Sequence, residues 1–258
     1  MQDCSVVAFN TATASSNKIH DDEVARRFGF RGGLVPGVDV YAYLCHPPVD
    51  AWGLDWLTRG TMQARFHRPV YDGQRVDITA GADGRLELRD GVGELCAEAV
   101  ARLPDHAVAL PDPHDWPVVE QNADPPTAAP EALVPGTAFG LAGHRFSTDE
   151  ARQYLTDVRE GSTVFTGEGV AHPGWILRDA NYVLSKNVRL GPWIHVESIV
   201  QHHGVVRDGE AVSARALVTK EWEHKAHRFV ELDVLHLADD RPVARTLHTA
   251  IYRPRQAA

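Results

Sequence analysis

The chain carries one sequence pattern twice. A Pro-Gly pair precedes a long apolar run in each half, at Pro36-Gly37 and at Pro173-Gly174. An Asp-Gly pair follows in each half, at Asp72-Gly73 and at Asp208-Gly209, and the two spacings are 36 and 35 residues. A period kept this closely predicts a duplicated structural unit, so the fold should consist of two similar halves.

Each copy is predicted to form one helix followed by several strands. Proline suits the first turn of a helix, and the apolar runs at 38–44 and 175–184 are long enough for buried helices. Segments of alternating polar and apolar residues follow each run, with Asp-Gly turns between some of them. This order of elements predicts an α+β fold. The expected strands span 61–68, 76–82, 85–88 and 94–103 in the first copy, and 193–202, 212–221, 228–237 and 242–252 in the second.

A proline-rich stretch separates the two copies. No lysine or arginine occurs between Leu103 and His144, and eight of the sixteen prolines lie between Pro104 and Pro135. Proline removes backbone donors and fixes φ, which favours an extended connection. We therefore expect an N-terminal unit at 1–103, a linker at 104–137 and a C-terminal unit at 138–258.

A histidine motif lies near the N-terminus. Asn17-Lys18-Ile19-His20 is followed by an acidic, helix-starting run and then by Gly29-Phe30. The segment resembles the signature of the MaoC-like, or R-specific, enoyl-CoA hydratases, which reads roughly Asp-x-Asn-Pro-Ile-His before an acidic helix and Gly-Phe. In this chain Ser15 stands at the position of the family's aspartate, and Lys18 replaces the proline. The segment 66–73, Phe-His-Arg-Pro-Val-Tyr-Asp-Gly, resembles the family's Phe-x-x-Pro-Val-x-x-Gly turn.

The resemblance implies a tandem, or double, hotdog fold, in which each half wraps an antiparallel sheet around a central helix. The N-terminal half would carry the active-site motif. The C-terminal half would lack it, because the segment between Val158 and Gly169 leaves no room for the motif and its helix. The resemblance further implies reversible addition of water to an enoyl thioester, with an acyl-CoA or acyl-carrier thioester as substrate and no separate cofactor.

Four residues of the motif are candidates for the chemistry. Histidine exchanges protons near neutral pH, which makes His20 the candidate acid or base. Asn17 is expected to orient the loop or contact substrate, and Ser15 could hold a water through its hydroxyl. Asp22 matches an aspartate that is common in the family two residues after the histidine, although carboxylates in a first helical turn usually serve the helix dipole.

The predicted helix starts supply candidate groups for a substrate carbonyl. Free amides at a helix N-terminus attract an oxygen that gains negative charge, so Gly37 and Val38 are candidate oxyanion donors. Glycine at this point also permits close approach of a ligand to the backbone. His172, at the second Pro-Gly, matches the family's helix-start histidine and is a candidate substrate contact, with a structural role at the turn as the alternative.

Several arginines near the motif could bind the phosphates of coenzyme A, because guanidinium groups bind phosphate in bidentate geometry. The alternative is that these charges are solvated on helix surfaces. The candidates are Arg26, Arg27, Arg31, Arg65 and Arg68.

Composition narrows the classes of partner. A net charge of −9 argues against nucleic acid, and no apolar run approaches the length of a membrane span. The N-terminus has no signal-peptide pattern, so we expect a cytoplasmic protein. The pairs His202-His203 and His224 with His227 lack supporting carboxylates or cysteines, so no metal site is predicted. A homodimer is compatible with the sequence.

Two other hypotheses of function are compatible with the sequence. A hotdog thioesterase, or another carbonyl-directed lyase or isomerase, would use a polarised carbonyl without the lost aspartate. A noncatalytic acyl-binding protein would have descended from hydratases after that loss.

Overall fold

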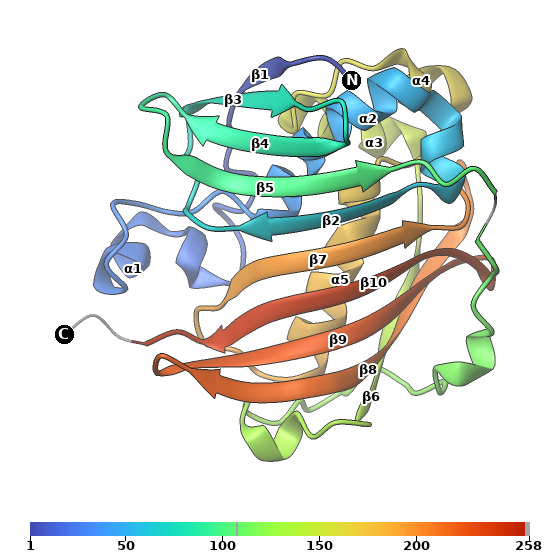
Figure 1. The fold of residues 1–258 in the computed structure, drawn as a ribbon. Helices are drawn as coiled ribbons and strands as arrows, with labels where there is room; N and C mark the ends of the chain where they lie inside the picture. The colour runs from blue at the N-terminus through green and yellow to red at the C-terminus, as the bar shows by residue number, and fades with distance from the viewer. Residues whose placement is uncertain (107, 256–258) are drawn as a thin grey trace.

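The two halves of the chain form one continuous antiparallel sheet. The computed structural model describes residues 1–106 and 108–255, and in them the sheet has ten strands. Figure 1 shows the strands side by side in one curved layer. The strands of the first half lie on one side of this sheet and those of the second half on the other. In spatial order they are β1 (Cys4–Val7), β3 (Arg75–Ala80), β4 (Arg85–Asp90), β5 (Leu95–Arg102), β2 (Thr61–Phe66), β7 (Ile194–His202), β10 (Arg241–Arg253), β9 (His227–Ala238), β8 (Ala211–His224) and β6 (Ala138–Arg145).

Two long helices cover one face of the sheet. In Figure 1, α2 (Gly37–Arg59) and α5 (Pro173–Asn187) lie behind the strands of their own halves, and the two helices contact each other. Each half is therefore a helix wrapped by antiparallel strands, as the sequence predicts. The remaining elements are η1 (Lys18–His20), α1 (Asp22–Arg27), η2 (Pro113–Asp115), η3 (Pro130–Ala132), α3 (Thr148–Asp157) and α4 (Thr163–Glu168).

The halves join through β2 and β7. These strands pair from Thr61 opposite Gln201 to Arg65 opposite Glu197. The Arg65 guanidinium of β2 also lies 3.1 Å from the Glu197 carboxylate of β7. Because β2 and β7 are the innermost strands of their halves, residues near their ends belong to both halves at once.

The structure differs from the sequence-based expectation in three elements. The first helix was expected at 38–44, but α2 continues to Arg59 through Pro47 and Pro48, which are both buried in the core. Gly53 has a φ of 53° and kinks the helix there. The strands β1 and β6 were not expected. The segment 158–169, where the sequence leaves no room for the motif and its helix, contains the short helix α4.

The segment 104–137 runs along the second half. Its described residues contain η2 and η3 and no strand. Trp116 is buried, and its indole nitrogen donates a hydrogen bond to the carbonyl of Asp233 at 3.0 Å. Leu133 is fully buried. The proline-rich stretch is thus an irregular connection that packs against the sheet.

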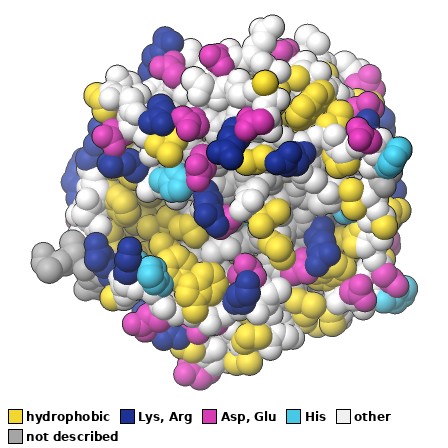
Figure 2. All heavy atoms as spheres, viewed as in Figure 1, with side chains coloured by type: hydrophobic (Ala, Val, Ile, Leu, Met, Phe, Trp, Pro, Cys, Tyr) yellow, Lys and Arg dark blue, Asp and Glu magenta, His cyan; other side chains and the backbone are white. Residues whose placement is uncertain are grey.

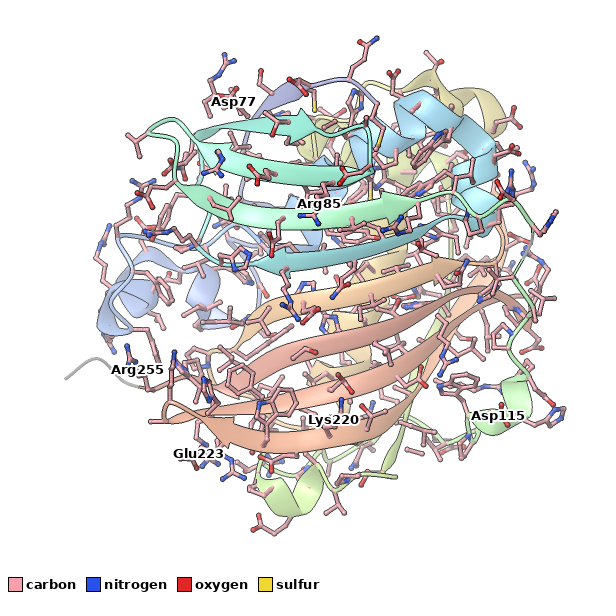
Figure 3. The ribbon with its side chains drawn as sticks, viewed as in Figure 1. Asp77, Arg85, Asp115, Lys220, Glu223 and Arg255 are labelled. Atoms are coloured by element: carbon pink, nitrogen blue, oxygen red, sulfur yellow. The ribbon has the colours of Figure 1, made fainter. Side chains whose placement is uncertain are left out.

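The outer face of the sheet carries many charged side chains. Figure 3 labels Asp77 on β3, Arg85 on β4 and Lys220 on β8, and Arg85 and Lys220 are exposed to solvent. The apolar side chains face the helices instead, as expected for a sheet with one solvated face. Among the described residues, no helix is both long and apolar enough to cross a membrane.

Candidate functional site

An apolar cavity opens where the two halves meet. Its volume is about 280 Å³, and it lies between the N-terminus of α2, the ends of β2 and β10, and the start of β7. In Figure 2, apolar side chains gather on the left of the face, in the region where Figure 1 shows the ends of β7 and β10. The apolar lining includes Ile19, Phe30, Leu34, Phe66, Val70 and Ile251.

Local capping holds the loop that carries His20. The Asn17 side chain accepts a hydrogen bond from the amide of Ile19 at 3.3 Å and caps η1. The Asp21 side chain then caps α1 by accepting from the amides of Glu23 and Val24. Asparagine and aspartate are favoured N-cap residues, so the sequence itself fixes this turn. The chain returns past Gly33, where a Cβ atom would collide with the His20 carbonyl.

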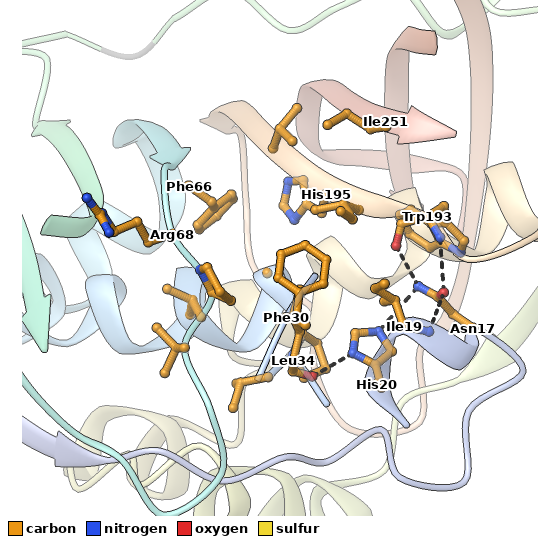
Figure 4. Close-up of a pocket in the computed structure, with 18 of the residues that line it drawn as sticks. Asn17, Ile19, His20, Phe30, Leu34, Phe66, Arg68, Trp193, His195 and Ile251 are labelled. Atoms are coloured by element: carbon orange, nitrogen blue, oxygen red, sulfur yellow. Dashed lines mark hydrogen bonds between the residues drawn. The ribbon is translucent and has the colours of Figure 1, made fainter. Parts of the chain in front are cut away.

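His20 lies at the cavity wall with one ring nitrogen engaged. Its Nδ1 lies 2.7 Å from the carbonyl oxygen of Leu34, and its Nε2 lies 3.3 Å from the side-chain nitrogen of Asn17 (Figure 4). A carbonyl can only accept, so Nδ1 carries the hydrogen and Nε2 carries the lone pair. Burial lowers the pKa of His20 below its ordinary value of 6.5. His20 is therefore a neutral imidazole with its basic nitrogen at the cavity.

Asn17 ties the loop to the other half of the protein. Its Oδ1 accepts from the amide of Trp193 at 3.2 Å, and its Nδ2 donates to the carbonyl of Trp193 at 3.0 Å. Asn17 is buried, and Trp193 directly precedes β7. The Asn17 side chain thus links the loop that carries His20 to the C-terminal half.

The first turn of α2 presents free backbone amides. Pro36 is the N-cap and makes no side-chain cap, and within the described chain neither Gly37 nor Val38 donates its N–H to a protein acceptor. Gly37 lines the apolar cavity. Its backbone lies against His195 of β7, because a Cβ atom at Gly37 would be 2.8 Å from His195 Nδ1. The arrangement can stabilise negative charge on a carbonyl oxygen that enters the cavity.

Gly37→Ala tests this close approach. The added methyl group must displace His195 or the start of α2, and overpacking of this kind costs about 1 to 3 kcal/mol. We expect a lower free energy of unfolding in urea titrations, together with weaker binding of acyl thioesters. Val38→Ala, which keeps the backbone amide, should leave ligand binding intact. Unchanged stability and binding in Gly37→Ala would contradict this description of the site.

Ser15 and Asp22 line hollows beside His20 other than the apolar cavity. The Ser15 hydroxyl accepts from the amide of Asn17 at 3.1 Å and so supports the loop. The Asp22 carboxylate is exposed, accepts from the amide of Gly33 at 2.7 Å and pairs with Arg26, and the Gly33 amide holds its pKa below the ordinary value. Neither residue lines the apolar cavity.

No carboxylate of the described residues forms an ion pair or hydrogen bond with His20. Asp39, in the first turn of α2, is completely buried and acts on His20 only through its charge. Its two oxygens are occupied by Arg178 at 2.9 Å and by the Thr11 hydroxyl at 2.5 Å. His20 therefore has no carboxylate partner among the described residues, and it shares the lining of the apolar cavity with His67, His195 and His227.

His172 lies outside this cavity. It caps α5, with Nδ1 accepting from the amide of Gly174 at 3.0 Å. Its Nε2 lies 3.5 Å from the carboxylate of Glu160, which also contacts His46 at 2.8 Å. The structure gives His172 a buried position at the helix start of the second half, where it does not contact the cavity at His20.

The candidate phosphate-binding arginines are largely paired with acidic groups. Arg26 and Arg27 pair with acids one turn earlier in α1, and Arg68 lies 2.8 Å from Glu94. Arg68 lines the apolar cavity at its edge, as Figure 4 shows. Arg31 stacks on the ring of Tyr71 at 4.1 Å and lines a separate, polar hollow on the other side of His20.

A second cavity, more polar than the first, adjoins the apolar one. Its volume is about 360 Å³, and it is bounded by the Asn17 loop and by α5. Five residues line both cavities and define what we call the junction: Asn17, His20, Pro36, Asn181 and Trp193. Among the described residues, no cluster of three or more histidine, cysteine, aspartate or glutamate side chains could hold a metal ion.

Two residues of the site were not among the sequence-based candidates. His195 belongs to β7 and Asn181 to α5, so both come from the half without the motif. His195 is buried, which lowers its pKa to about 3. In the sequence, His195 and Asn181 stand out only as polar residues within an apolar strand and helix. That pattern does not distinguish a site residue from a core residue whose polar atoms are hydrogen-bonded.

Comparisons with known proteins define the fold. No model of a known protein family matches the sequence, and no curated protein matches it. A putative MaoC domain protein dehydratase from Chloroflexus aurantiacus superposes with a TM-score of 0.65 at 13% identity, covering 98% of this chain and 93% of the other. A further structure, described as a MaoC-like dehydratase, has a TM-score of 0.63 at 11% identity, covering 97% and 98% of the two chains.

The description of a third similar structure names the fold. It is a conserved hypothetical protein from Mycobacterium tuberculosis with a double hotdog fold, at a TM-score of 0.60 and 15% identity, covering 97% of this chain and 96% of the other. The chain is therefore a double hotdog protein. Two of these three structural neighbours are described as MaoC-like dehydratases, and the comparison confirms the fold that the sequence resemblance implied.

Proposed function

We propose that the protein adds water reversibly to an enoyl thioester. One observation carries the proposal: a neutral imidazole with its basic nitrogen at an apolar cavity, beside the free amides of a helix N-terminus. An acyl chain suits the apolar walls of such a cavity. The thioester carbonyl would accept from the amides of Gly37 or Val38, and His20 would transfer the proton.

The proposed hydration needs one base that returns its proton. His20 Nε2 takes a proton from water as the water oxygen bonds to Cβ of the enoyl group. The electrons of the double bond move toward the carbonyl oxygen, where the α2 amides stabilise the developing charge. His20 then delivers the proton to Cα, and dehydration is the reverse. Because the proton taken from water ends on substrate, this route needs no second acid.

The rate should follow the protonation of His20. Burial lowers its pKa, so the imidazole stays neutral and able to accept a proton at pH values below those of an exposed histidine. We expect the kcat/KM of hydration to be constant from about pH 8 down to about pH 6.5 and to fall only at lower pH. Measured pH–rate profiles would contradict this role if the rate instead fell steadily from pH 8.

A panel of thioesters tests the reaction class. We expect interconversion of enoyl and β-hydroxyacyl thioesters, followed by chromatography of both species. Release of free thiol without a hydroxyacyl product would instead support a hotdog thioesterase.

The absence of a carboxylate partner for His20 among the described residues favours one alternative, a noncatalytic acyl-binding protein. The Asn17 amide lies 3.3 Å from His20 Nε2, where it competes for the lone pair. Binding of enoyl and hydroxyacyl thioesters with no turnover of either would support this alternative and exclude the hydratase.

A further inference from the structure

Asn181 presents an unpaired acceptor inside the protein. It lies on α5, in the half that lacks the histidine motif, and its side chain lines both cavities at the junction. Its Oδ1 is buried and has no hydrogen-bond partner among the described residues. Buried polar atoms are almost always paired, so such an atom in a cavity indicates a group that a ligand satisfies.

Two other polar side chains of the junction, those of Asn17 and His20, are already engaged. Both ends of the Asn17 amide bond to the backbone of Trp193, and His20 Nδ1 bonds to the Leu34 carbonyl. His20 Nε2 has only the long contact with Asn17. A ligand at the junction therefore meets two acceptors, Asn181 Oδ1 and His20 Nε2.

Two hydrogen-bond acceptors in one cavity favour a ligand group that donates hydrogen bonds. The carbonyl oxygen of an amide has no hydrogen to give, so Asn181 Oδ1 cannot bind the thioester carbonyl through it. A water molecule has two hydrogens and can serve both acceptors, and a β-hydroxyl group has one. Outside the junction, the lining of the apolar cavity has a further acceptor without a partner among the described residues, His195 Nδ1, which lies next to Gly37.

We propose that Asn181 recognises a hydroxyl group at the β carbon of the acyl chain, and the water that becomes it, by accepting a hydrogen bond at Oδ1. The role in water positioning rests on the proposed hydration, whereas recognition of the hydroxyl requires only that the cavity binds the acyl group. In the reaction, His20 would take one proton of the water while Asn181 holds the other.

Binding measurements test this recognition separately from the rate of the reaction. We would titrate the protein with 3-hydroxybutyryl-CoA and with butyryl-CoA in a calorimeter. The wild-type protein should bind the hydroxyacyl thioester about tenfold more tightly, as expected for one well-placed hydrogen bond. Asn181→Leu should remove this preference while leaving the affinity for butyryl-CoA within about twofold. Asn181→Asp, which keeps an acceptor, should retain the preference.

Three results would overturn the proposal. If Asn181→Leu lowered the affinity for both thioesters equally, Asn181 would contact the carrier rather than the hydroxyl group. If Asn181→Leu still bound the hydroxyacyl thioester more tightly, Asn181 would not recognise the hydroxyl group. If the wild-type protein bound both thioesters equally, no hydroxyl recognition would exist. Hydration by the wild-type protein is a separate measurement, so a failure of the proposed reaction would be distinguished from a failure of this recognition.

Asn187 on the same helix is a matched control. It is buried like Asn181 Oδ1, but its Nδ2 donates to the carbonyls of Gly140 and Val183 at 2.8 and 2.7 Å. Asn187→Leu should lower the Tm and leave the hydroxyl preference unchanged. Asn181→Leu should not lower the Tm, because no protein hydrogen bond is lost. A Tm that falls as far in Asn181→Leu as in Asn187→Leu would indicate a structural role and contradict the proposal.

Discussion

Replacing His20 by asparagine should lower the rate of the proposed hydration by a factor of about a hundred to ten thousand, which is the range for loss of a general acid or base. The asparagine Nδ2 can still donate to the Leu34 carbonyl, which now faces His20 Nδ1 at 2.7 Å. The base at the cavity is lost while the support of the loop is kept. Steady-state kinetics on an enoyl thioester would measure the effect, with the loss expected in kcat.

His20→Ala serves as the companion variant. It removes both the base and the bond to Leu34, so it should lower the rate as His20→Asn does and also lower the Tm slightly. The affinity for a saturated acyl thioester should stay close to that of the wild-type protein in both variants. If His20→Asn kept more than a tenth of the wild-type rate, His20 would not be the proton-transfer group.

Acid should destabilise the protein at pH values above those at which carboxylates titrate. Four histidines are buried on the inner side of the second half's strands, and burial lowers the pKa of each. The value is about 3 for His195 and His202, about 4 for His236, and well below the ordinary value for His248. Between about pH 6 and pH 4.5 the unfolded chain therefore binds up to four more protons at these sites than the folded chain.

The sign of this effect follows from linkage. A base with a lowered folded pKa stabilises the fold above its unfolded pKa and loses that contribution as the pH falls. Each group contributes about 1.4 kcal/mol per pH unit, so the four together give a loss of up to about 5 kcal/mol per unit below pH 6. Glu160 raises the pKa of His46, and Asp179 raises the pKa of His144. The stability that these two ion pairs contribute is lost only as the pH rises, so it does not oppose the loss in acid.

Urea unfolding at several pH values would measure the slope. We expect His236→Gln to reduce the slope by about one proton, because the amide does not titrate and can still reach the Thr246 hydroxyl that now lies 3.1 Å from His236 Nε2. A free energy of unfolding that stays flat from pH 7 to pH 5 would contradict the neutral, buried state of these histidines.

Much of the fold was predictable because its signals are local. The Pro-Gly pairs do mark the starts of α2 and α5, and the predicted strands agree with the observed ones to within a few residues. The full length of α2 was not predictable, since Pro47 and Pro48 normally end a helix and only tertiary packing keeps them inside one. The edge strands β1 and β6 depend on partners from distant parts of the sequence.

The site was predictable only where one segment supplies it. His20 and Gly37 were identified from the motif and the helix start, and the structure brings both to one cavity. Asn181 and His195 reach that cavity only because β2 pairs with β7 and α5 packs on α2. No pattern along the chain reports that pairing, so the contribution of the second half to the site required the three-dimensional structure.

The most direct test of the proposed function is the incorporation of heavy oxygen from labelled water. We would incubate the wild-type protein with an enoyl thioester in this water and examine the product by mass spectrometry, with His20→Asn as the control. The proposed reaction predicts a β-hydroxyacyl thioester that carries one heavy oxygen at Cβ, formed by the wild-type protein and lost in the variant. Bound but unchanged enoyl thioester, or label found only in a released carboxylic acid, would contradict it.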